Sequence, residues 1–278
     1  MTATVCILAS SSRGNATAIS FDDSGRFVLV DAGISPKRVR AAILESGSVA
    51  RFQRLRAIFL THLDSDHWTA SWAAQMKRAP VPILVRKEHA PLAVKLGVPA
   101  TCLRTMNGAA FRLGDTATIT AIPVPHDDLG STAFRMDCEH ASIGHATDLG
   151  CVDDELVDAF ASVDILNIES NYDEEMQLRS SRPEFLKRRI MGNAGHLSNE
   201  QSVAAVAKIA AHGTLRHLNL LHLSEQCNRP EIVREAFGAG VPSMADCLHI
   251  SAPTAPTPAV RWSRTVLANY QLIGNPQD

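Results

Sequence analysis

The stretch Thr61-His62-Leu63-Asp64-Ser65-Asp66-His67-Trp68 holds two histidines and two aspartates within six consecutive residues. It directly follows the apolar run Ala57-Ile58-Phe59-Leu60, which is typical of a buried strand. The four polar side chains are therefore expected in a loop at a strand end, where a tight turn can aim them at one point. Neutral imidazole and carboxylate are ligands of zinc, iron and manganese. The alternative is a polar turn that is merely rich in His and Asp, and we favour a metal site.

This stretch resembles the His-x-His-x-Asp-His signature of the metallo-β-lactamase superfamily. It departs from that signature at Asp64, which stands where the family carries its second histidine. In the family, the first half of the signature serves one metal ion and the Asp-His half serves a second. Asp64 can still bind a metal ion, but its harder oxygen shifts the preference from zinc towards manganese or iron. The resemblance implies two divalent metal ions as cofactors, with zinc, manganese and iron as candidates.

The composition of the 278-residue chain is that of an ordinary globular protein, with 45% hydrophobic and 20% charged residues. The sequence contains no apolar run of 18 or more residues and no secretion signal, so we expect no membrane segment. The six cysteines are scattered without a metal-binding spacing, which favours a reduced, cytoplasmic setting. The net charge of −2 gives no support by itself to nucleic-acid binding.

Short β-rich runs and amphipathic segments alternate along the chain. Strands are expected at 5–9, 16–21, 27–30, 57–60, 81–85, 110–111, 116–123, 131–137, 142–145, 165–168 and 217–221, and helices at 36–46, 70–77, 89–96, 153–160, 199–212 and 230–237. These elements suggest an α/β (α+β) protein with two mixed sheets and helices outside both. That architecture matches the αβ/βα four-layer sandwich of the resembled superfamily, whose metal site lies along one edge between the sheets.

The proline-rich segment Ser251–Pro258 is the one low-complexity stretch. We expect it to leave the compact body, which divides the chain into a metallo-β-lactamase-fold domain at 1–250 and a linker and tail at 251–278. The segment 260–273 is either a last strand or an arm.

Three more candidate ligands, His126, Asp148 and His222, lie at predicted strand ends. Each alone is typical of a polar residue at a strand end, but together they match, in order, the later ligand motifs of the superfamily. The resemblance implies two ligand sets and a bridge: His62, Asp64 and His126 for the first metal, Asp66, His67 and His222 for the second, and Asp148 between them. It also implies that Asp31 supports the ligand loop by hydrogen bonding. Two ions at bridging distance could activate a water molecule as hydroxide, which suits hydrolysis.

Glu169 ends a predicted strand, and Gly195-His196-Leu197-Ser198 precedes a predicted helix. Their order resembles the phosphodiesterase side of the superfamily, including tRNase Z. The resemblance implies that His196 protonates the leaving alkoxide while Glu169 orients and charges the imidazole. Asp66, His196 and Glu169 are the predicted catalytic residues. In the alternative, His196 belongs with Ser198 and Asn199 to a helix cap. Both can hold, since Asn199 can cap the helix while His196 faces the site, and Asn199 is also expected to support the site from behind.

Two segments are candidates for substrate binding. The loop Ser10–Asn15 offers backbone N–H groups that could face an anion, with a plain hairpin turn as the alternative. The run Arg179–Arg189 carries four arginines and a lysine, and it is either a contact for a phosphate backbone or a solvated helix face. The predicted substrate-binding residues are Ser11, Ser12, Asn15, Asn171, Arg182, Lys187 and Arg188.

Four stretches resemble the YycJ-like (WalJ-like) branch of the superfamily: Leu8–Asn15, Glu169–Asn171, Lys187–Ile190 and Gly195–Glu200. That branch is associated with metal-dependent 5′→3′ exonuclease action on DNA, so we expect a phosphodiesterase that acts on nucleic acid, with DNA favoured. One alternative is a hydrolase of a small phosphodiester, a thioester or a lactam. A second is a non-catalytic binding protein on the same fold. The polarity and strandedness of the substrate are left open, as is the oligomeric state, for which a homodimer is one option.

Overall fold

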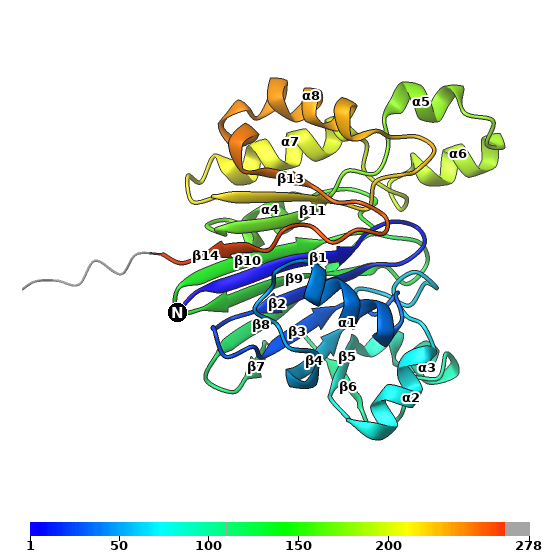
Figure 1. Ribbon diagram of the computed structural model, residues 1–278. Helices are drawn as coiled ribbons and strands as arrows, with labels where there is room; N and C mark the ends of the chain where they lie inside the picture. The colour runs from blue at the N-terminus through cyan, green and yellow to red at the C-terminus, as the bar shows by residue number, and fades with distance from the viewer. Residues whose placement is uncertain (109, 265–278) are drawn as a thin grey trace, which may run out of the picture.

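The computed structural model describes residues 1–108 and 110–264. Two seven-stranded sheets face each other, and helices cover the outer face of each, so the chain forms the expected four-layer αβ/βα sandwich (Figure 1). Within each sheet, neighbouring strands are antiparallel on one side and parallel on the other, so both sheets are mixed.

The first sheet is built from the N-terminal part of the chain and one strand from near its other end. Its strands lie in the order β14 (Val260–Trp262), β1 (Ala3–Ala9), β2 (Ala16–Ser20), β3 (Phe27–Val30), β4 (Leu55–Phe59), β5 (Ile83–Arg86) and β6 (Leu103–Met106). Its outer face is covered by α1 (Pro36–Glu45), α2 (Ser71–Arg78) and α3 (Ala90–Lys95), with short 3₁₀ helices η1 (Phe52–Arg54) and η2 (Lys87–His89) in the connections.

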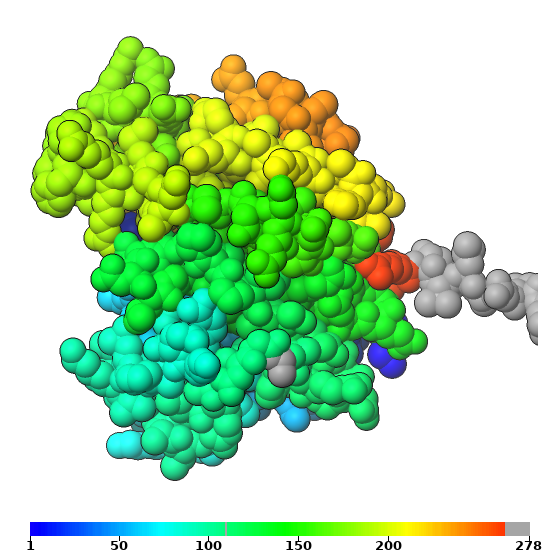
Figure 2. All heavy atoms as spheres, turned by 180° about the vertical axis from the view of Figure 1, so that it is seen from behind, coloured from blue at the N-terminus to red at the C-terminus, as the bar shows by residue number. Residues whose placement is uncertain are grey.

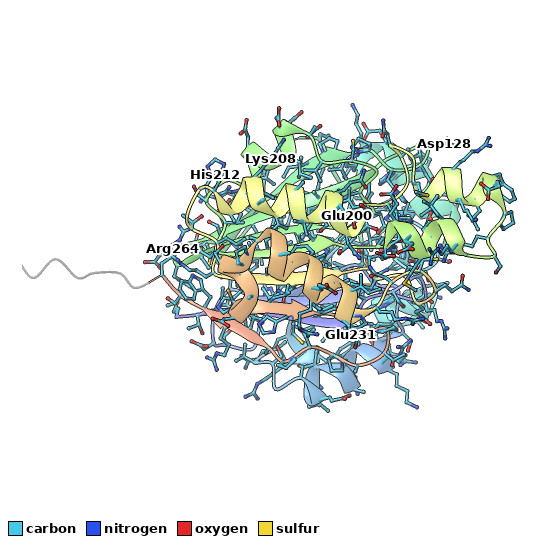
Figure 3. All side chains as sticks on the ribbon, turned by 90° about the horizontal axis from the view of Figure 1, so that it is seen from above. Asp128, Glu200, Lys208, His212, Glu231 and Arg264 are labelled. Atoms are coloured by element: carbon cyan, nitrogen blue, oxygen red, sulfur yellow. The ribbon has the colours of Figure 1, made fainter. Side chains whose placement is uncertain are left out.

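The second sheet comes from the rest of the chain. Its strands lie in the order β13 (Leu248–Ile250), β12 (His217–Leu221), β11 (Ile165–Glu169), β10 (Ala141–Ala146), β9 (Ser131–Cys138), β8 (Ala117–Val124) and β7 (Phe111–Leu113). Its outer face is covered by α4 (Asp154–Ala159), α7 (Asn199–Ala210) and α8 (Pro230–Gly240), and η3 (Pro242–Cys247) follows α8. Figure 3 shows α7 and α8 side by side and labels Glu200, Lys208 and Glu231, which are exposed on these helices.

The alternation of side chains along each strand builds three apolar cores. In β3, Phe27 and Leu29 pack against the helices of the first sheet, whereas Val28 and Val30 pack between the two sheets. A third core lies beneath α4, α7 and α8, where Val206 and Phe237 are buried. Because strands of both sheets bury both faces, they are near-continuous apolar runs in sequence, which is why their positions could be predicted.

Several elements were not predicted. They are β6, β13 and two short helices, α5 (Glu174–Arg179) and α6 (Glu184–Ile190). Helices of six or seven residues span fewer than two full turns and give little periodicity to recognise. Both helices stand out from the body at one end of the sheets, in the upper right of Figure 1.

The expectation that the proline-rich segment leaves the compact body is wrong for residues 251–264. The Thr257 backbone N–H donates to the Ile7 carbonyl at 2.9 Å, and the Thr257 hydroxyl accepts from the Ile7 N–H at 3.2 Å. Val260 is buried in β14, which pairs with β1. The segment therefore runs along the edge of the first sheet and covers backbone groups that β1 would otherwise expose. Residues 265–278 of the expected tail lie outside the described residues.

No helix in the described ranges is long and apolar enough to cross a membrane.

A chain that ends at Ile250 should be less stable than one that ends at Arg264. The shorter chain loses the buried Val260 side chain and the pairing of β14 with β1, which together stabilise the fold by at least about 2 kcal/mol. For a domain of this size that corresponds to a fall in Tm of roughly 4–8 °C, measurable by calorimetry. Equal Tm values for the two chains would show that the segment contributes nothing to the fold.

Candidate active site

One polar cluster lies where strands of both sheets end at the same edge. Its residues follow or end six strands: Asp31 after β3, His62 after β4, His126 after β8, Asp148 after β10, Glu169 at the end of β11 and His222 after β12. Asp64, Asp66 and His67 lie in the same loop as His62. The cluster therefore brings together all seven predicted metal ligands.

Three residues of this cluster have a left-handed backbone. The φ angle is 61° at Asp31, 57° at Asp148 and 56° at His222. Residues other than glycine rarely adopt this conformation, and each instance costs about 1–3 kcal/mol. Such strain persists only where the surrounding structure imposes it, which is common at functional sites.

Asp31 holds the ligand loop, as predicted from sequence. Its carboxylate accepts hydrogen bonds from the Thr61 backbone N–H at 2.9 Å and from the Thr61 hydroxyl at 3.0 Å. It also lies 2.8 Å from Nδ1 of His67. The second imidazole nitrogen of His67 is thereby turned towards the cluster, which is the way a buried carboxylate orients a metal-binding histidine.

The same loop is tied to two earlier segments through its backbone. Asn15 donates its backbone N–H to the Asp66 carbonyl at 2.7 Å, and its side-chain amide nitrogen lies 3.1 Å from the Asp66 carboxylate and 3.0 Å from Nε2 of His67. Gly33 lies so close to the loop that a Cβ atom there would be 1.7 Å from the Asp66 carbonyl oxygen. Only glycine therefore fits at position 33.

The buried carboxylate of Asp148 lies at the centre of the cluster. Its Oδ2 is 3.1 Å from Nε2 of His67, and its Oδ1 is 3.6 Å from Nε2 of His222 and 3.9 Å from Nε2 of His126. Oδ2 is buried, and apart from this ion-pair contact with His67 it has no well-aligned hydrogen-bond partner among the described residues. A buried, unsatisfied carboxylate oxygen is expensive unless an ion or solvent completes its contacts.

Donor atoms in the cluster form several groups with metal-ligand spacing. Atoms within 4.8 Å of one another come from His62, Asp64 and His126; from Asp66, His67 and His222; from His62, His67 and Asp148; and from Asp148, Glu169, His196 and His222. The first two groups match the two predicted ligand sets, and Asp148 lies beside both. Imidazole and carboxylate donors at this spacing fit divalent metal ions. Asp64 is the most open of these ligands, with a side chain that is 58% exposed.

The carboxylates and imidazoles strongly perturb one another. Burial alone would lower the pKa of His67 and His222, but the negative charges of Asp31 and Asp148, respectively, outweigh it and raise both values well above 6.5. Burial would raise the pKa of Asp148, yet the charges of His222 and His67 hold it well below its usual range. For His62, burial and the nearby charge of His67 both lower the pKa.

His196 and Glu169 form a close pair beside this cluster. Nδ1 of His196 lies 2.6 Å from the Glu169 carboxylate, which is fully buried and also accepts from the Leu149 N–H at 2.7 Å. Burial by itself would lower the pKa of His196, but the charge of Glu169 and its hydrogen bond outweigh burial and raise it. His196 also lines the cavity over the metal ligands, so it can present a proton there.

A buried polar network supports this pair and His222 from behind. The Asn171 amide donates to the His222 carbonyl at 2.7 Å, and the Ser202 hydroxyl donates to the Glu169 carbonyl at 2.6 Å. Asn228, which the sequence did not single out, donates to the backbone carbonyls of Ser170 and Asn171 at 3.0 Å. Each group therefore fixes the position of a segment that carries a site residue.

The cap of the helix after His196 is Ser198 and not Asn199. The Ser198 hydroxyl accepts from the Gln201 N–H, and the Gln201 side chain accepts from the Ser198 N–H, which is a capping box. Asn199 is fully buried and instead bonds to Ser170 and Asn228. Both sequence interpretations thus hold in part, because Ser198 caps the helix while His196 faces the site.

The loop Ser10–Asn15 does not form an anion-binding turn. The N–H groups of Ser11, Arg13, Gly14 and Asn15 all donate to oxygens within the protein. Ser11 is fully buried, and Asn15 contacts Asp66 and His67, so neither is open to a substrate. Of the predicted residues in this loop, Ser12 alone lines the cavity beside the metal ligands.

The other predicted substrate contacts also lie away from that cavity. The Lys187 ammonium is buried against the Leu178 carbonyl, Arg182 bonds to Gln177 and Gln226, and Asn171 is held by His222. Arg188 is exposed but does not line the cavity. Its neighbour Arg189 does line the cavity, although Arg188 and not Arg189 is among the predicted substrate-binding residues. The sequence does not show which side of a short helix faces the site.

Two cavities flank the cluster. One, of about 230 Å³, is lined by Asp64, Asp66, His196, His222 and Arg189 among others. The other, of about 210 Å³, begins at His62 and Asp64 and extends towards Leu92 and Gly130. Asp64, His126 and Asp127 line both, so these residues lie between the two cavities.

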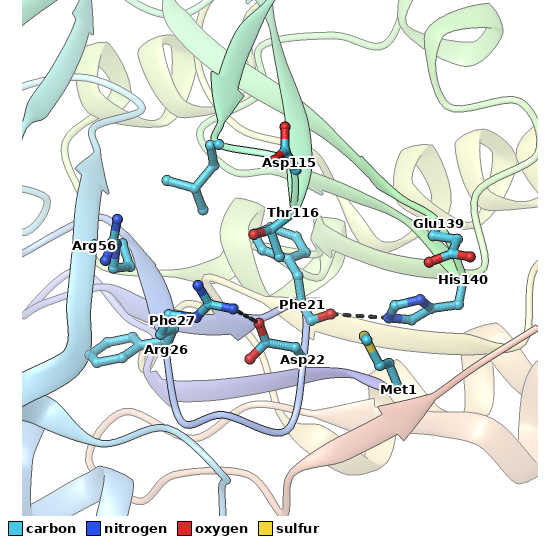
Figure 4. Close-up of a pocket in the computed structure, with 12 residues that line it drawn as sticks. Met1, Phe21, Asp22, Arg26, Phe27, Arg56, Asp115, Thr116, Glu139 and His140 are labelled. Carbon is cyan, nitrogen blue, oxygen red and sulfur yellow. Dashed lines mark hydrogen bonds and ion pairs between the residues drawn. The ribbon is translucent and has the colours of Figure 1, made fainter.

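A larger cavity of about 400 Å³ lies at the opposite ends of the strands (Figure 4). It is lined by the turns before β3, between β7 and β8, and between β9 and β10. Asp22 pairs there with Arg26 at 2.6 Å, and Nε2 of His140 lies 3.0 Å from the Phe21 carbonyl oxygen. None of the clustered ligands lines it, so its size does not make it the reaction site.

Comparison with known proteins agrees with this geometry. Residues 26–222 match the family described as the beta-lactamase superfamily domain. The chain is 27% identical over 265 residues to the exodeoxyribonuclease YycJ of Bacillus anthracis, covering 90% of this chain and 96% of that protein. It is 29% identical over 231 residues to the exodeoxyribonuclease WalJ of Streptococcus pneumoniae, covering 81% and 83%.

The fold is also shared with a solved structure. The metallo-beta-lactamase fold protein YhfI from Bacillus subtilis superposes with a TM-score of 0.69 at 14% sequence identity, covering 94% of this chain and 100% of that one.

Replacing Gly33 by alanine should weaken metal binding at least about tenfold, the smallest effect usual for residues that orient ligands. The added Cβ would collide with the Asp66 carbonyl and displace the loop that carries Asp66 and His67. Metal content after gel filtration and titration with a chromophoric chelator would measure the loss. Gly238→Ala is the matched control, because nothing lies within 4 Å of its added Cβ. Unchanged affinity in Gly33→Ala would dissociate this loop from metal binding.

Metal affinity should fall as the pH is lowered. The pKa values of His67 and His222 are raised in the metal-free protein, so both imidazoles hold protons that a metal ion must displace. Below these raised values, the apparent Kd should weaken by about tenfold per pH unit for each displaced proton, and it should level off above them. Titrations at pH 6, 7 and 8 would test this, and a constant Kd across that range would contradict it.

Proposed function

The chain belongs to the beta-lactamase superfamily and is a metal-dependent hydrolase, and we propose that its reaction is the hydrolysis of phosphodiesters in DNA, working from a strand end. The observation that carries this proposal is the pair formed by His196 and Glu169 beside the ligand cluster. An alkoxide leaving group, as in a nucleic-acid backbone, needs a proton, and this pair is built to donate one.

Two features favour DNA within the broader class of phosphodiesters. The two relatives are both named exodeoxyribonucleases, and they match over most of their length. Cavities lie on both sides of the ligands, which suits a polymer better than a single closed pocket would. The identities of 27% and 29% leave the choice of DNA to experiment.

The residues that would hold two divalent ions are the two predicted ligand sets with Asp148 between them. Such ions would supply an activated water nucleophile and would neutralise the phosphate. The oxygen-rich character that Asp64 gives to one site favours manganese or iron over zinc there.

The protein's own groups position the substrate and move its protons. His196 would donate a proton to the leaving oxygen from the side facing the cavity, while Glu169 holds Nδ1 and keeps the ring charged. Asp31 and Asn171 keep His67 and His222 in place, so that the attacked phosphorus lies at a fixed distance from His196. This division between fixed ligands and one proton donor is what in-line phosphoryl transfer needs.

Charge in the cavity makes metal binding a condition for binding DNA. Asp64, Asp66, Asp127 and Asp148 line it, and Arg189 is its one arginine or lysine among the described residues. In the metal-free site the protonated imidazoles of His196 and His222 offset only part of this negative charge, so divalent ions are needed to attract a phosphate backbone. Chelation should therefore abolish the binding of DNA as well as its hydrolysis.

The variants Asp148→Ala and His196→Ala should fail for different reasons. Asp148→Ala should lose metal and all activity, because the central carboxylate is gone. His196→Ala should keep its metal but cleave DNA about 10²–10⁴-fold more slowly, the usual contribution of a general acid. Cleavage of bis(p-nitrophenyl) phosphate should fall much less in His196→Ala, because p-nitrophenolate leaves without a proton. End-labelled linear DNA with added manganese or zinc would provide the assay.

His212→Ala changes an exposed histidine just beyond the C-terminal end of α7; it is the control and should behave as wild type (Figure 3). Equal losses on both substrates in His196→Ala would remove its role as proton donor. A wild-type protein that cleaves the small diester but no DNA would favour a small-molecule phosphodiesterase instead.

A further inference from the structure

The arm formed by α5 and α6 overhangs the end of the molecule that carries the site (Figures 1 and 2). It exposes two large apolar side chains, Leu178 at 55% and Phe185 at 74%. Single exposed apolar residues are common on protein surfaces, so exposure alone assigns them nothing. Phe185 differs from Leu178 because it lies on α6, and α6 is hydrogen-bonded to segments of the site.

The C-terminal end of α6 is bonded directly to catalytic segments. The His196 N–H donates to the Ile190 carbonyl at 2.8 Å, and Nδ1 of His126 lies 2.9 Å from the Gly195 carbonyl oxygen. A Cβ at Gly195 would lie 2.2 Å from the carbonyl oxygens of Arg189 and Ile190. The backbone at Gly195 therefore packs directly against the end of α6. Movement of α6 would displace two predicted site residues, and its orientation relative to the ligands is therefore fixed.

Arg189 carries the positive charge of α6 into the cavity. Its guanidinium pairs with both oxygens of Asp127, with Nε to Oδ1 at 3.1 Å. Asp127 directly follows His126, has a φ of 39°, and donates its backbone N–H to the Ala194 carbonyl at 2.9 Å. The Arg189 side chain is nevertheless 62% exposed, so its remaining donors are free for a phosphate.

Phe185 lies four residues before Arg189, which places both on one face of α6, about 5–6 Å apart at Cβ. Leu186, Arg189 and Ile190 line the cavity, whereas Phe185 is exposed to solvent one residue before Leu186 on the same helix. An exposed aromatic ring next to a phosphate-binding cation is the combination by which proteins hold nucleic-acid strands without reading their sequence.

We propose that α6 holds one nucleotide of the substrate strand, with Arg189 on its phosphate and the Phe185 ring stacked on its base. The proposal rests on the function proposed above and extends it, since it requires a base with a free face. Interior base pairs of a duplex have both faces covered by their neighbours. The ligand is therefore a nucleotide at a strand end or in a single strand, and small phosphodiesters without a base would gain nothing from Phe185.

The test compares oligonucleotides that carry or lack bases. Metal-loaded wild-type protein and Phe185→Ala are assayed on linear strands that are normal or have abasic residues at the three terminal positions. Loss of one stack should raise KM by about 5- to 100-fold with little change in kcat. The abasic strand should show the same rise with wild-type protein. In Phe185→Ala the abasic change should add nothing further, because both changes remove one interaction.

Three other variants sharpen the comparison. Phe185→Trp should restore the preference for the base-bearing strand, and Phe185→Leu should not. Arg189→Ala should raise KM for normal and abasic strands alike and should reduce the salt dependence of binding. Leu178→Ala, the other exposed apolar residue of the arm, should match wild type on every substrate.

Two substrates separate the possible sources of the free base. A circular single strand offers free bases without an end, and a blunt linear duplex offers an end without a single strand. If the base comes from a single strand, Phe185→Ala should bind the circular strand more weakly than wild type does. If the base comes from a strand end, Phe185→Ala should bind the blunt duplex more weakly. A wild-type preference for base-bearing strands that persists in Phe185→Ala would overturn the proposal. Absence of cleavage of any strand by wild-type protein would instead overturn the proposed function.

Discussion

Burial of the Asp148 carboxylate among imidazoles is the constraint on which the rest of the site depends. Four histidines, at 67, 126, 196 and 222, each place a ring nitrogen within 3.9 Å of it. A buried charge at this depth would be strongly destabilising if it were unpaired. The left-handed backbone at Asp148 and His222 is the local cost of bringing these groups together, and divalent ions held there would offset the mutual repulsion of the neighbouring carboxylates.

The sandwich makes this arrangement possible because its two halves contribute equally. Asp31 and the loop from His62 to His67 come from the first sheet, and Asp148, Glu169 and His222 come from the second. The core between the sheets, with Val28, Phe59, Phe134 and Ile143, sets their separation and hence the distance between the two ligand sets. Hydrogen bonds from Asn15, Asn171 and Asn228 then hold each loop against its neighbours. Precision at the site thus comes from packing that lies outside it.

The three adjacent basic residues of helix α6 show that position on the helix decides which of them can reach the cavity. Lys187 is buried against a backbone carbonyl, Arg188 is exposed and does not line the cavity, and Arg189 lines it. Three adjacent basic residues therefore have three different environments. A net charge or a local count of cations cannot distinguish them, since the helix turns by about 100° per residue.

The sequence by itself determined the fold class, most strand positions and the order of the ligand motifs, since apolar runs followed by His or Asp are local signals. The pairing of His196 with Glu169 was also predicted, although the two are 27 residues apart. Only the tertiary structure decided that Arg189 lines the cavity, that Ser11 and Lys187 are buried and that residues 251–264 run along β1. Those outcomes depend on which face of a short element meets a distant segment. No local pattern encodes that, because it is set by the packing of the whole sandwich.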